Sequence, residues 1–157
     1  MKQGEVLMKE RERRKIPAEE MAGKLGLPLD RYLAIEAGDS PAERWGPAIR
    51  DLAVALGAYT SRMFAPSGRS ADTRPGQAGE LIREHRESRQ LGAEEVAAKI
   101  GVSPEEYSRI ESGSSEIEEW GPFFLRFAET LENGFPVFNL FHPFGLPFEK
   151  LSLEDYR

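Results

Sequence analysis

The chain has 157 residues, of which 39% are hydrophobic and 31% are charged, and its formal net charge is −6. This composition is typical of a globular chain, and no stretch approaches the ~20 apolar residues of a transmembrane helix. The absence of cysteine excludes disulfides and thiolate chemistry, and the wide separation of His85 from His142 argues against a histidine metal site or a bound cofactor.

The first part of the chain predicts two short helices, over 4–14 and 18–25. Residues 1–15 are strongly charged and lack the apolar core of a secretory signal, so we expect a cytoplasmic protein. In 18–25 the apolar residues recur at the spacing i, i+3, i+4 and i+7, which is typical of one face of a helix. Gly26 follows directly and predicts a left-handed helix end.

Three further helices are expected before residue 65. One ends at Gly38, the next begins at Trp45-Gly46-Pro47, and a short fifth helix falls near 59–64. Five short helices with a tight glycine turn between the second and third describe a helix-turn-helix unit, so we expect a first domain over 1–64. Residues 65–78 are rich in Pro, Gly and Ser, have no helical or strand period, and predict a linker.

The chain then repeats itself. Residues 4–57 align without a gap on 79–132, and 22 of the 54 positions are identical. We therefore expect a second domain over 79–134. Its third helix opens with Ser103 as N-cap, Pro104 in the first turn and Glu106 placed to complete a capping box. The two tryptophans of the repeat, at 45 and 120, are interpreted as core residues rather than as binding aromatics.

Residues 135–157 lie outside the repeat and form a Phe/Pro-rich extension whose prolines exclude a long helix. Two interpretations remain open: the segment packs across both units and completes their core, or it contacts a second copy or a protein partner. The phenylalanines that either contact would use are Phe135, Phe138, Phe141, Phe144 and Phe148.

Both copies carry the elements A-E-E-x-A-x-K and Y-x-x-I-E-x-G in the same register. These motifs resemble the lambda-repressor-like (XRE) helix-turn-helix family, and the resemblance covers about 110 residues. It implies an all-α fold with two tandem five-helix domains, and a third helix that enters the major groove of double-stranded DNA.

The resemblance also separates scaffold from site. It implies salt bridges between Arg11 and Glu36 and between Arg86 and Glu111, which tie the first helix of each unit to the end of the third. The alternative, that the two glutamates are functional carboxylates, stays open.

The DNA-reading positions are chemically mixed. On the third helix of copy one only Arg31 suits a base or a phosphate, whereas copy two offers Ser108, Arg109 and Ser112 beside two glutamates. Arg44 is the basic residue of the loop after the third helix in copy one.

A basic cluster at the end of the first helix, Arg13, Arg14 and Lys15, is either a solvated helix face or a phosphate contact. Residues 1–78 hold 13 basic and 11 acidic side chains, whereas 79–157 hold 8 and 16. The acidic second half is expected to repel a phosphate backbone.

The sequence thus predicts a DNA-binding transcriptional regulator in which the tandem units act as a pseudo-dimer on two half-sites. The alternative is a helix-turn-helix scaffold that serves as a protein interaction module with little DNA binding. No nucleophile and base set, metal spacing or phosphate-binding loop is present, so an enzyme is not expected.

Overall fold

The structure, a computed structural model, describes residues 1–132 and 134–144. Every regular element within these residues is a helix, which confirms the all-α prediction. The α-helices are α1 (Gln3–Arg13), α2 (Ala18–Leu25), α3 (Leu29–Glu36), α4 (Ala42–Leu56), α5 (Gln77–Ser88), α6 (Ala93–Lys99), α7 (Pro104–Ser112) and α8 (Ile117–Leu131). Three 3-10 helices complete the set: η1 (Ser61–Met63), η2 (Ser70–Asp72) and η3 (Val137–Phe144).

Local signals in the sequence place most helix ends. Gly26 has φ 70° and ends α2 in the left-handed conformation, as its position predicted. At the start of α7, the Ser103 hydroxyl accepts a hydrogen bond from the backbone N–H of Glu106 (3.1 Å). The Glu106 carboxylate itself is turned toward Arg44, so the expected capping box keeps only its serine half within the described chain.

Two helices differ from the prediction. Helix α4 begins at Ala42 rather than at Trp45, because the Ser40 hydroxyl accepts a hydrogen bond from the Ala42 N–H (3.1 Å) and supports an earlier first turn. The expected fifth helix near 59–64 is only the single turn η1. Pro66 follows two residues after that turn's C-cap and disfavours helical backbone in the residue before it.

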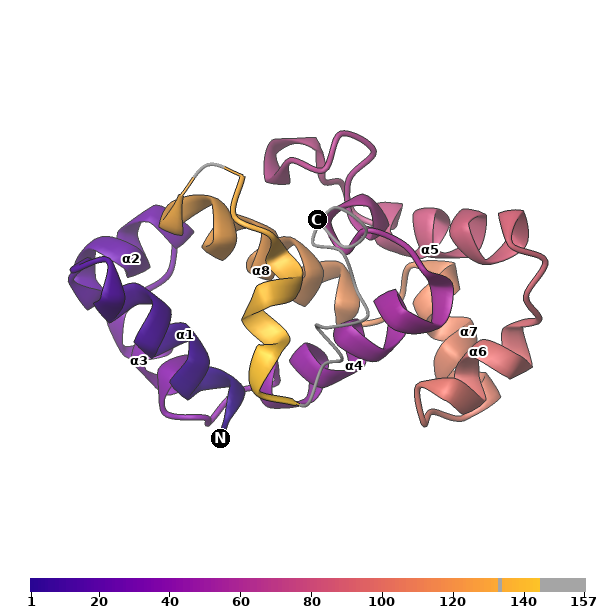
Figure 1. The fold of residues 1–157 in the computed structure, drawn as a ribbon, viewed down its shortest axis with the longest axis horizontal. Coiled ribbons are helices and arrows are strands. Elements are labelled where there is room, and N and C mark those ends of the chain that lie inside the picture. Colours follow the sequence, from indigo (N-terminus) through magenta and orange to yellow (C-terminus); the bar gives the residue numbers. More distant parts are fainter. Residues whose placement is uncertain (133, 145–157) are drawn as a thin grey trace.

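The fourth helices of the two repeats cross over. Helices α1–α3 lie at one end of the molecule and α5–α7 at the other, with α4, α8 and η3 between them (Figure 1). Helix α4 packs against α6 of the other copy, and α8 packs against α2, while α4 and α8 also touch each other. Each fourth helix also packs against the first helix of its own copy, α4 on α1 and α8 on α5, so the two fourth helices bridge the lobes.

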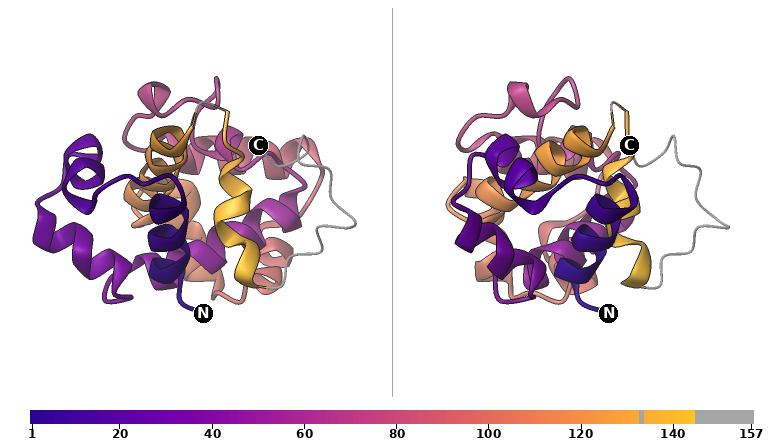
Figure 2. Two further views of the ribbon diagram at one scale, coloured as in Figure 1. Left: turned by 60° about the vertical axis from the view of Figure 1, so that its left-hand side comes forward. Right: turned by 90° about the vertical axis from the view of Figure 1, so that its left-hand side faces the viewer.

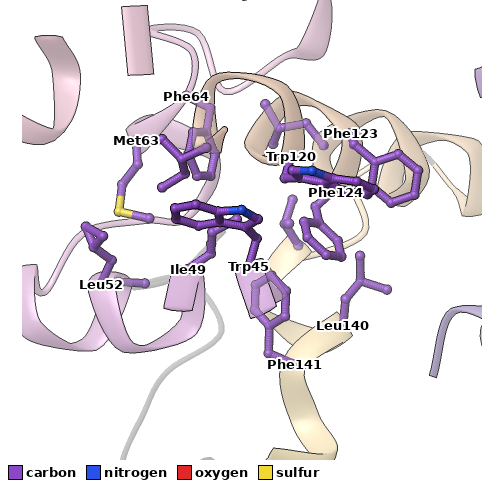
Figure 3. Close-up of a cluster of buried hydrophobic side chains, with 14 of the residues drawn as sticks. Trp45, Ile49, Leu52, Met63, Phe64, Trp120, Phe123, Phe124, Leu140 and Phe141 are labelled. Atoms are coloured by element: carbon purple, nitrogen blue, oxygen red, sulfur yellow. The ribbon is translucent and has the colours of Figure 1, made fainter. Parts of the chain in front are cut away.

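This crossing produces one continuous core. Trp45, Trp120, Phe64 and Phe124 are all nearly inaccessible to solvent and meet in the middle of the molecule (Figure 3). The indole N–H of Trp45 lies 3.5 Å from a carboxylate oxygen of Glu116, a contact between the copies. The tryptophans are core residues, as interpreted from the sequence.

The segment between the repeats is held against the second copy rather than hanging free. The backbone N–H of Ser70 donates to Glu129 of α8 (2.9 Å), and Gln77 is buried with its amide donating to the carbonyl oxygen of Phe64 (3.2 Å). Helix α5 accordingly begins at Gln77, inside the range expected to be linker.

The start of the C-terminal extension packs in cis. Helix η3 lies against α1, α4 and α8, as the two turned views also show (Figure 2). Phe138 and Phe141 are 1% and 0% exposed, and the carbonyl oxygen of Leu140 accepts from the Gln3 side chain (2.9 Å). These residues complete the core, so they present no surface to a partner. The side chain of Phe144, and Phe148, lie outside the described residues.

Candidate nucleic-acid interface

Helices α6 and α7, with the turn between them, form the helix-turn-helix part of the second repeat. Ser108, Arg109 and Ser112 are exposed and lie at i, i+1 and i+4, so they share the outer side of α7. The Ser112 hydroxyl donates to the backbone oxygen of Arg109 (3.1 Å). Within the described residues the Arg109 guanidinium has no hydrogen bond or ion pair. The exposed Glu105 lies one turn before Arg109 on the same side, so the face displays one unpaired cation, two hydroxyls and one carboxylate.

The matching face of α3 is largely apolar. Leu29 and Leu33 are 37% and 44% exposed one turn apart, and Ala37 is exposed after them. Apolar side chains offer no donor or acceptor to a base edge, although they can contact a thymine methyl group. Arg31 is the one cation of this face in the described chain.

Two predicted cations of the first copy lie in ion pairs that join the two repeats. Nη2 of Arg31 on α3 lies 2.9 Å from Oε1 of Glu119 on α8. At the repeat-equivalent place, Arg44 on α4 pairs with Glu106 on α7 and also stacks over the Trp45 ring, 4.6 Å from its centroid. Arg31 and Arg44 therefore already have carboxylate partners.

A cleft of about 230 Å³ lies beside the first of these pairs and shows the local charge. Its lining includes the carboxylates of Asp39, Glu116 and Glu119 against the single guanidinium of Arg31. A smaller cleft of about 140 Å³ beside the second pair is lined by Glu106 and Glu116 and also by Arg109 of α7. The start of α8 thus brings acidic groups next to α3, where phosphate would be repelled.

The basic cluster at the end of α1 is partly neutralised in the same way. Arg14 lies 2.7 Å from Glu10 and 2.9 Å from Glu132, and its guanidinium covers the Phe135 ring. Arg13 pairs with the same Glu10 at 2.8 Å. Lys15, exposed and with φ 57°, has no ion pair in the described chain. It is the one cation of the three without a carboxylate partner.

The residues expected to hold the scaffold form bidentate ion pairs. In copy one, Nε and Nη2 of Arg11 donate to the Glu36 carboxylate at 2.6 and 3.0 Å, and Nη1 donates to the carbonyl oxygen of Ile16 at 2.8 Å. The Tyr32 hydroxyl donates a hydrogen bond to the same carboxylate. Burial is the main cause that raises the pKa of Tyr32, and this hydrogen bond is the second. With three donors on it, the Glu36 carboxylate has a structural role.

Copy two repeats the arginine contacts, but its buried Tyr107 hydroxyl has no hydrogen-bond partner among the described residues. Nε and Nη2 of Arg86 lie 2.6 and 3.0 Å from the Glu111 carboxylate, and Nη1 donates to the carbonyl oxygen of Leu91 at 2.9 Å. Burial raises the pKa of Tyr107 beside it. The carboxylates of Glu36 and Glu111 are thus both occupied by arginine.

Sequence reasoning missed a second pair of repeated carboxylates. Glu43 of α4 accepts from the backbone N–H groups of Gln3 (2.9 Å) and Gly4 (2.8 Å), where α1 begins. Glu118 of α8 accepts from Gly79 (2.9 Å) in the same way. A carboxylate at a helix N-terminus accepts hydrogen bonds from the free N–H groups and is stabilised by the positive end of the helix dipole. Glu43 and Glu118 occupy equivalent positions of the repeat, and this identity is the signal in the sequence that could have found them.

Other kinds of site are not found in the described part of the chain. No group of three or more His, Cys, Asp or Glu side chains there is arranged to hold a metal ion. No helix among those residues is long and apolar enough to cross a membrane.

Comparison with known families agrees with this geometry for the second repeat. Residues 77–132 match the family model of a helix-turn-helix domain. No curated protein and no solved structure gives a significant match to the chain. The described residues are thus all-α, and residues 77–132 are similar to a helix-turn-helix domain, a kind of domain typical of DNA-binding regulators.

Proposed function

We propose that the protein is a DNA-binding regulator of the lambda-repressor-like kind in which α7 is the reading helix. One observation carries the proposal. Ser108, Arg109 and Ser112 are exposed and share the outer side of α7, inside the segment that matches a helix-turn-helix domain. In such domains this helix lies in the major groove.

The chemistry of this face suits base edges. An arginine can donate two parallel hydrogen bonds to O6 and N7 of guanine, and serine hydroxyls can donate to or accept from any base. Because Arg109 has no carboxylate partner in the described chain, DNA does not have to break an ion pair to engage it.

The proposal assigns base reading to one copy. The third helix of the first copy presents Leu29 and Leu33, and its Arg31 is held by Glu119. The tandem repeat is then a scaffold with one reading helix rather than a pseudo-dimer with two. Few phosphate contacts and a net charge of −6 predict weak nonspecific binding with a shallow salt dependence.

The test measures binding of a labelled pool of random-sequence duplexes by fluorescence anisotropy at ~50 mM salt, followed by selection of the bound sequences. We expect selection to enrich a short motif, and Arg109→Ala to cost about 1–3 kcal/mol of binding free energy on that motif. Arg83→Ala is the matched control, because Arg83 is an exposed arginine of α5, outside the reading helix. Absence of any duplex binding at this salt, or equal losses in the two variants, would refute the proposal.

A second function is favoured by one observation, the ion pairs that occupy Arg31 and Arg44 between the copies. A helix-turn-helix scaffold whose cations serve to join its own repeats is suited to protein interaction through the exposed leucines of α3. Under this function no duplex binds even at low salt, and Leu33→Ser abolishes a protein complex without changing the fold. Duplex binding that depends on Arg109 excludes it as the main function.

A further inference from the structure

A cavity of about 400 Å³ opens between the second half of α8, residues 59–69 and residues 134–137. The segment that carries η1 and η2 lies along α8 there (Figure 1). The volume of the cavity falls in the range of small-molecule sites, about 300–1,000 Å³. None of the residues that line it belongs to α7, so the cavity is separate from the proposed reading face.

The floor of the cavity is apolar. Leu125, Ala128 and Val137 line it and are 1%, 1% and 4% exposed, and the half-buried ring of Phe135 stands at its side. Because the three floor side chains expose almost no surface, a ligand with an apolar body would gain mainly from removing its own surface and that of the Phe135 ring from water.

The rim of the cavity is cationic. Arg62 and Arg69 line it from either side of the 66–68 turn, and the exposed Tyr59 adds a hydroxyl. Arg62 is held in place by a hydrogen bond from Nη1 to the carbonyl oxygen of Pro66. In the described chain the Arg69 guanidinium and the Tyr59 hydroxyl have no partner, so both are available to a ligand.

The turn that carries Arg69 is fixed before any ligand binds. The backbone N–H of Ser67 donates to Oδ2 of Asp72 (3.0 Å), and the N–H of Arg69 donates to the Ser67 hydroxyl (3.3 Å). The N–H and hydroxyl of Ser70 both donate to the Glu129 carboxylate on α8. A rim already ordered in this way loses little conformational entropy on binding.

The charge of the lining decides the class of ligand. Glu129 is the one acidic residue of the lining, its carboxylate is occupied by Ser70, and two arginines oppose it. The Asp72 carboxylate, bound by the Ser67 N–H, is not part of the lining, so among the described lining residues two arginines stand against one glutamate in a protein whose net charge is −6. We propose that the cavity binds a small organic anion, a carboxylate or a phosphate ester with an apolar body.

Binding at this place would act on the joint between the repeats. The walls come from the segment that connects the copies and from α8, which packs against α2 of the other lobe. A ligand that bridges these walls binds only the folded arrangement and stabilises it by mass action. The site does not rest on the DNA-binding proposal, and its test uses no DNA.

The experiment titrates the full chain with three probes by isothermal calorimetry at low salt: phenyl phosphate, inorganic phosphate and phenol. We expect phenyl phosphate to bind at one site and each of the other probes to bind at least about tenfold more weakly, because each engages only the rim or only the floor. Arg69→Gln should weaken phenyl phosphate binding about ten- to a hundredfold, the usual range for one charged hydrogen bond. Arg83→Gln, with the same charge change on α5, should keep the wild-type affinity.

Three results would overturn the proposal. They are no saturable binding of either phenyl phosphate or benzoate, inorganic phosphate binding as tightly as the tighter of these two, and equal losses in Arg69→Gln and Arg83→Gln. A carboxylate arm with benzoate then distinguishes the two sources of negative charge, because the tighter of benzoate and phenyl phosphate identifies the headgroup. The melting temperature of each variant without ligand reports whether it is folded.

Discussion

Arg31 on α3 and Glu119 on α8 form an ion pair of 2.9 Å, and the same pair recurs across the repeat with its charges reversed. The repeat-equivalent positions hold Glu106 and Arg44, which also pair with each other. Each lobe is thus linked to the opposite copy's fourth helix by one arginine and one glutamate. This reversal favours pairing of the first copy with the second. Two first copies in the same arrangement would place Arg31 beside Arg44, and two second copies would place Glu106 beside Glu119.

Releasing the two arginines tests whether they are masked DNA contacts. In the double variant Glu106→Gln/Glu119→Gln, we expect the slope of log K against log salt to steepen by about 0.9 for each arginine that reaches a phosphate. The cost in folding stability should be about 0–1 kcal/mol for each pair, because both pairs are partly exposed. Anisotropy titrations at several salt concentrations and urea unfolding supply the two measurements.

The control for this variant is Glu87→Gln, which removes one negative charge from an exposed position of α5 and leaves both ion pairs intact. A general electrostatic effect would change binding by the same amount for each charge removed, wherever the charge lies. If the control and the double variant shift the salt dependence equally per charge, the ion pairs do not mask DNA contacts.

The repeated glycines of α1 and α5 should be intolerant of a side chain. A Cβ at Gly4 would clash with the backbone oxygens of residues 35 and 36, and one at Gly79 with those of 110 and 111. Backbone cannot give way as a flexible side chain does, so we expect Gly4→Ala to destabilise the fold by about 1–3 kcal/mol. Urea or thermal unfolding measures the change.

Gly23 provides the matched control within the same repeat. It lies inside α2, where a Cβ would have no other atom within 4 Å, and the second copy already has Ala98 at this position. Gly23→Ala should therefore stabilise the protein by up to about 1 kcal/mol through helix propensity. Destabilisation by Gly23→Ala as large as that by Gly4→Ala would show that close packing of α1 on α3 is not the cause.

His85 predicts a loss of stability toward acid pH. Its Nε2 lies 3.2 Å from the carbonyl oxygen of Arg62, so it donates there and Nδ1 accepts from Arg89 (3.2 Å). Burial, and then the nearby Arg89, lower the pKa of His85 below its ordinary value of 6.5. Because the folded pKa is depressed, the unfolded chain binds the proton more readily. The stabilisation is complete above pH 6.5 and declines as the pH falls through the folded value.

The measurement is the free energy of unfolding between about pH 5 and pH 8, the range in which histidine titrates. His85→Gln keeps hydrogen-bonding capacity at this position without a titrating group, so its stability should vary less with pH than that of the wild-type chain. Parallel curves for the two proteins would show that carboxylates alone set the acid dependence.

Much of the local structure was predictable from the sequence, because helix ends and caps depend on residues close together in the chain. Gly26 and Ser103 ended and began helices where their chemistry requires it. The ion pairs of Arg11 and Arg86 lie where the family resemblance placed them.

The crossing of α4 and α8 was not predictable in the same way. The inner face of α4 would meet nearly the same apolar pattern on α2 as it meets on α6, with Met21 and Leu25 in one and Val96 and Ile100 in the other. A repeat therefore leaves the partner of each fourth helix undecided, and the choice rests on long-range packing. The reversed charges at 31 and 106 were present in the sequence, but they indicate ion pairs between the copies only once α3 is known to contact α8.

The exchange of fourth helices makes the matched domain incomplete on its own. Residues 77–132 include α8 and its contact with α5, but they lack α2, against which α8 also packs, and α4, against which α6 packs. In isolation this fragment would expose the apolar side of α8, where Phe124 and Phe127 are fully buried in the whole chain. We expect it to be poorly folded or associated, whereas residues 1–144 should fold as a monomer with a cooperative transition. Circular dichroism, amide NMR dispersion and light scattering distinguish these states. A monomeric, well-dispersed 77–132 fragment would mean that α8 can fold back onto α6, and that the crossing is a preference of the linked chain rather than a requirement of the domain.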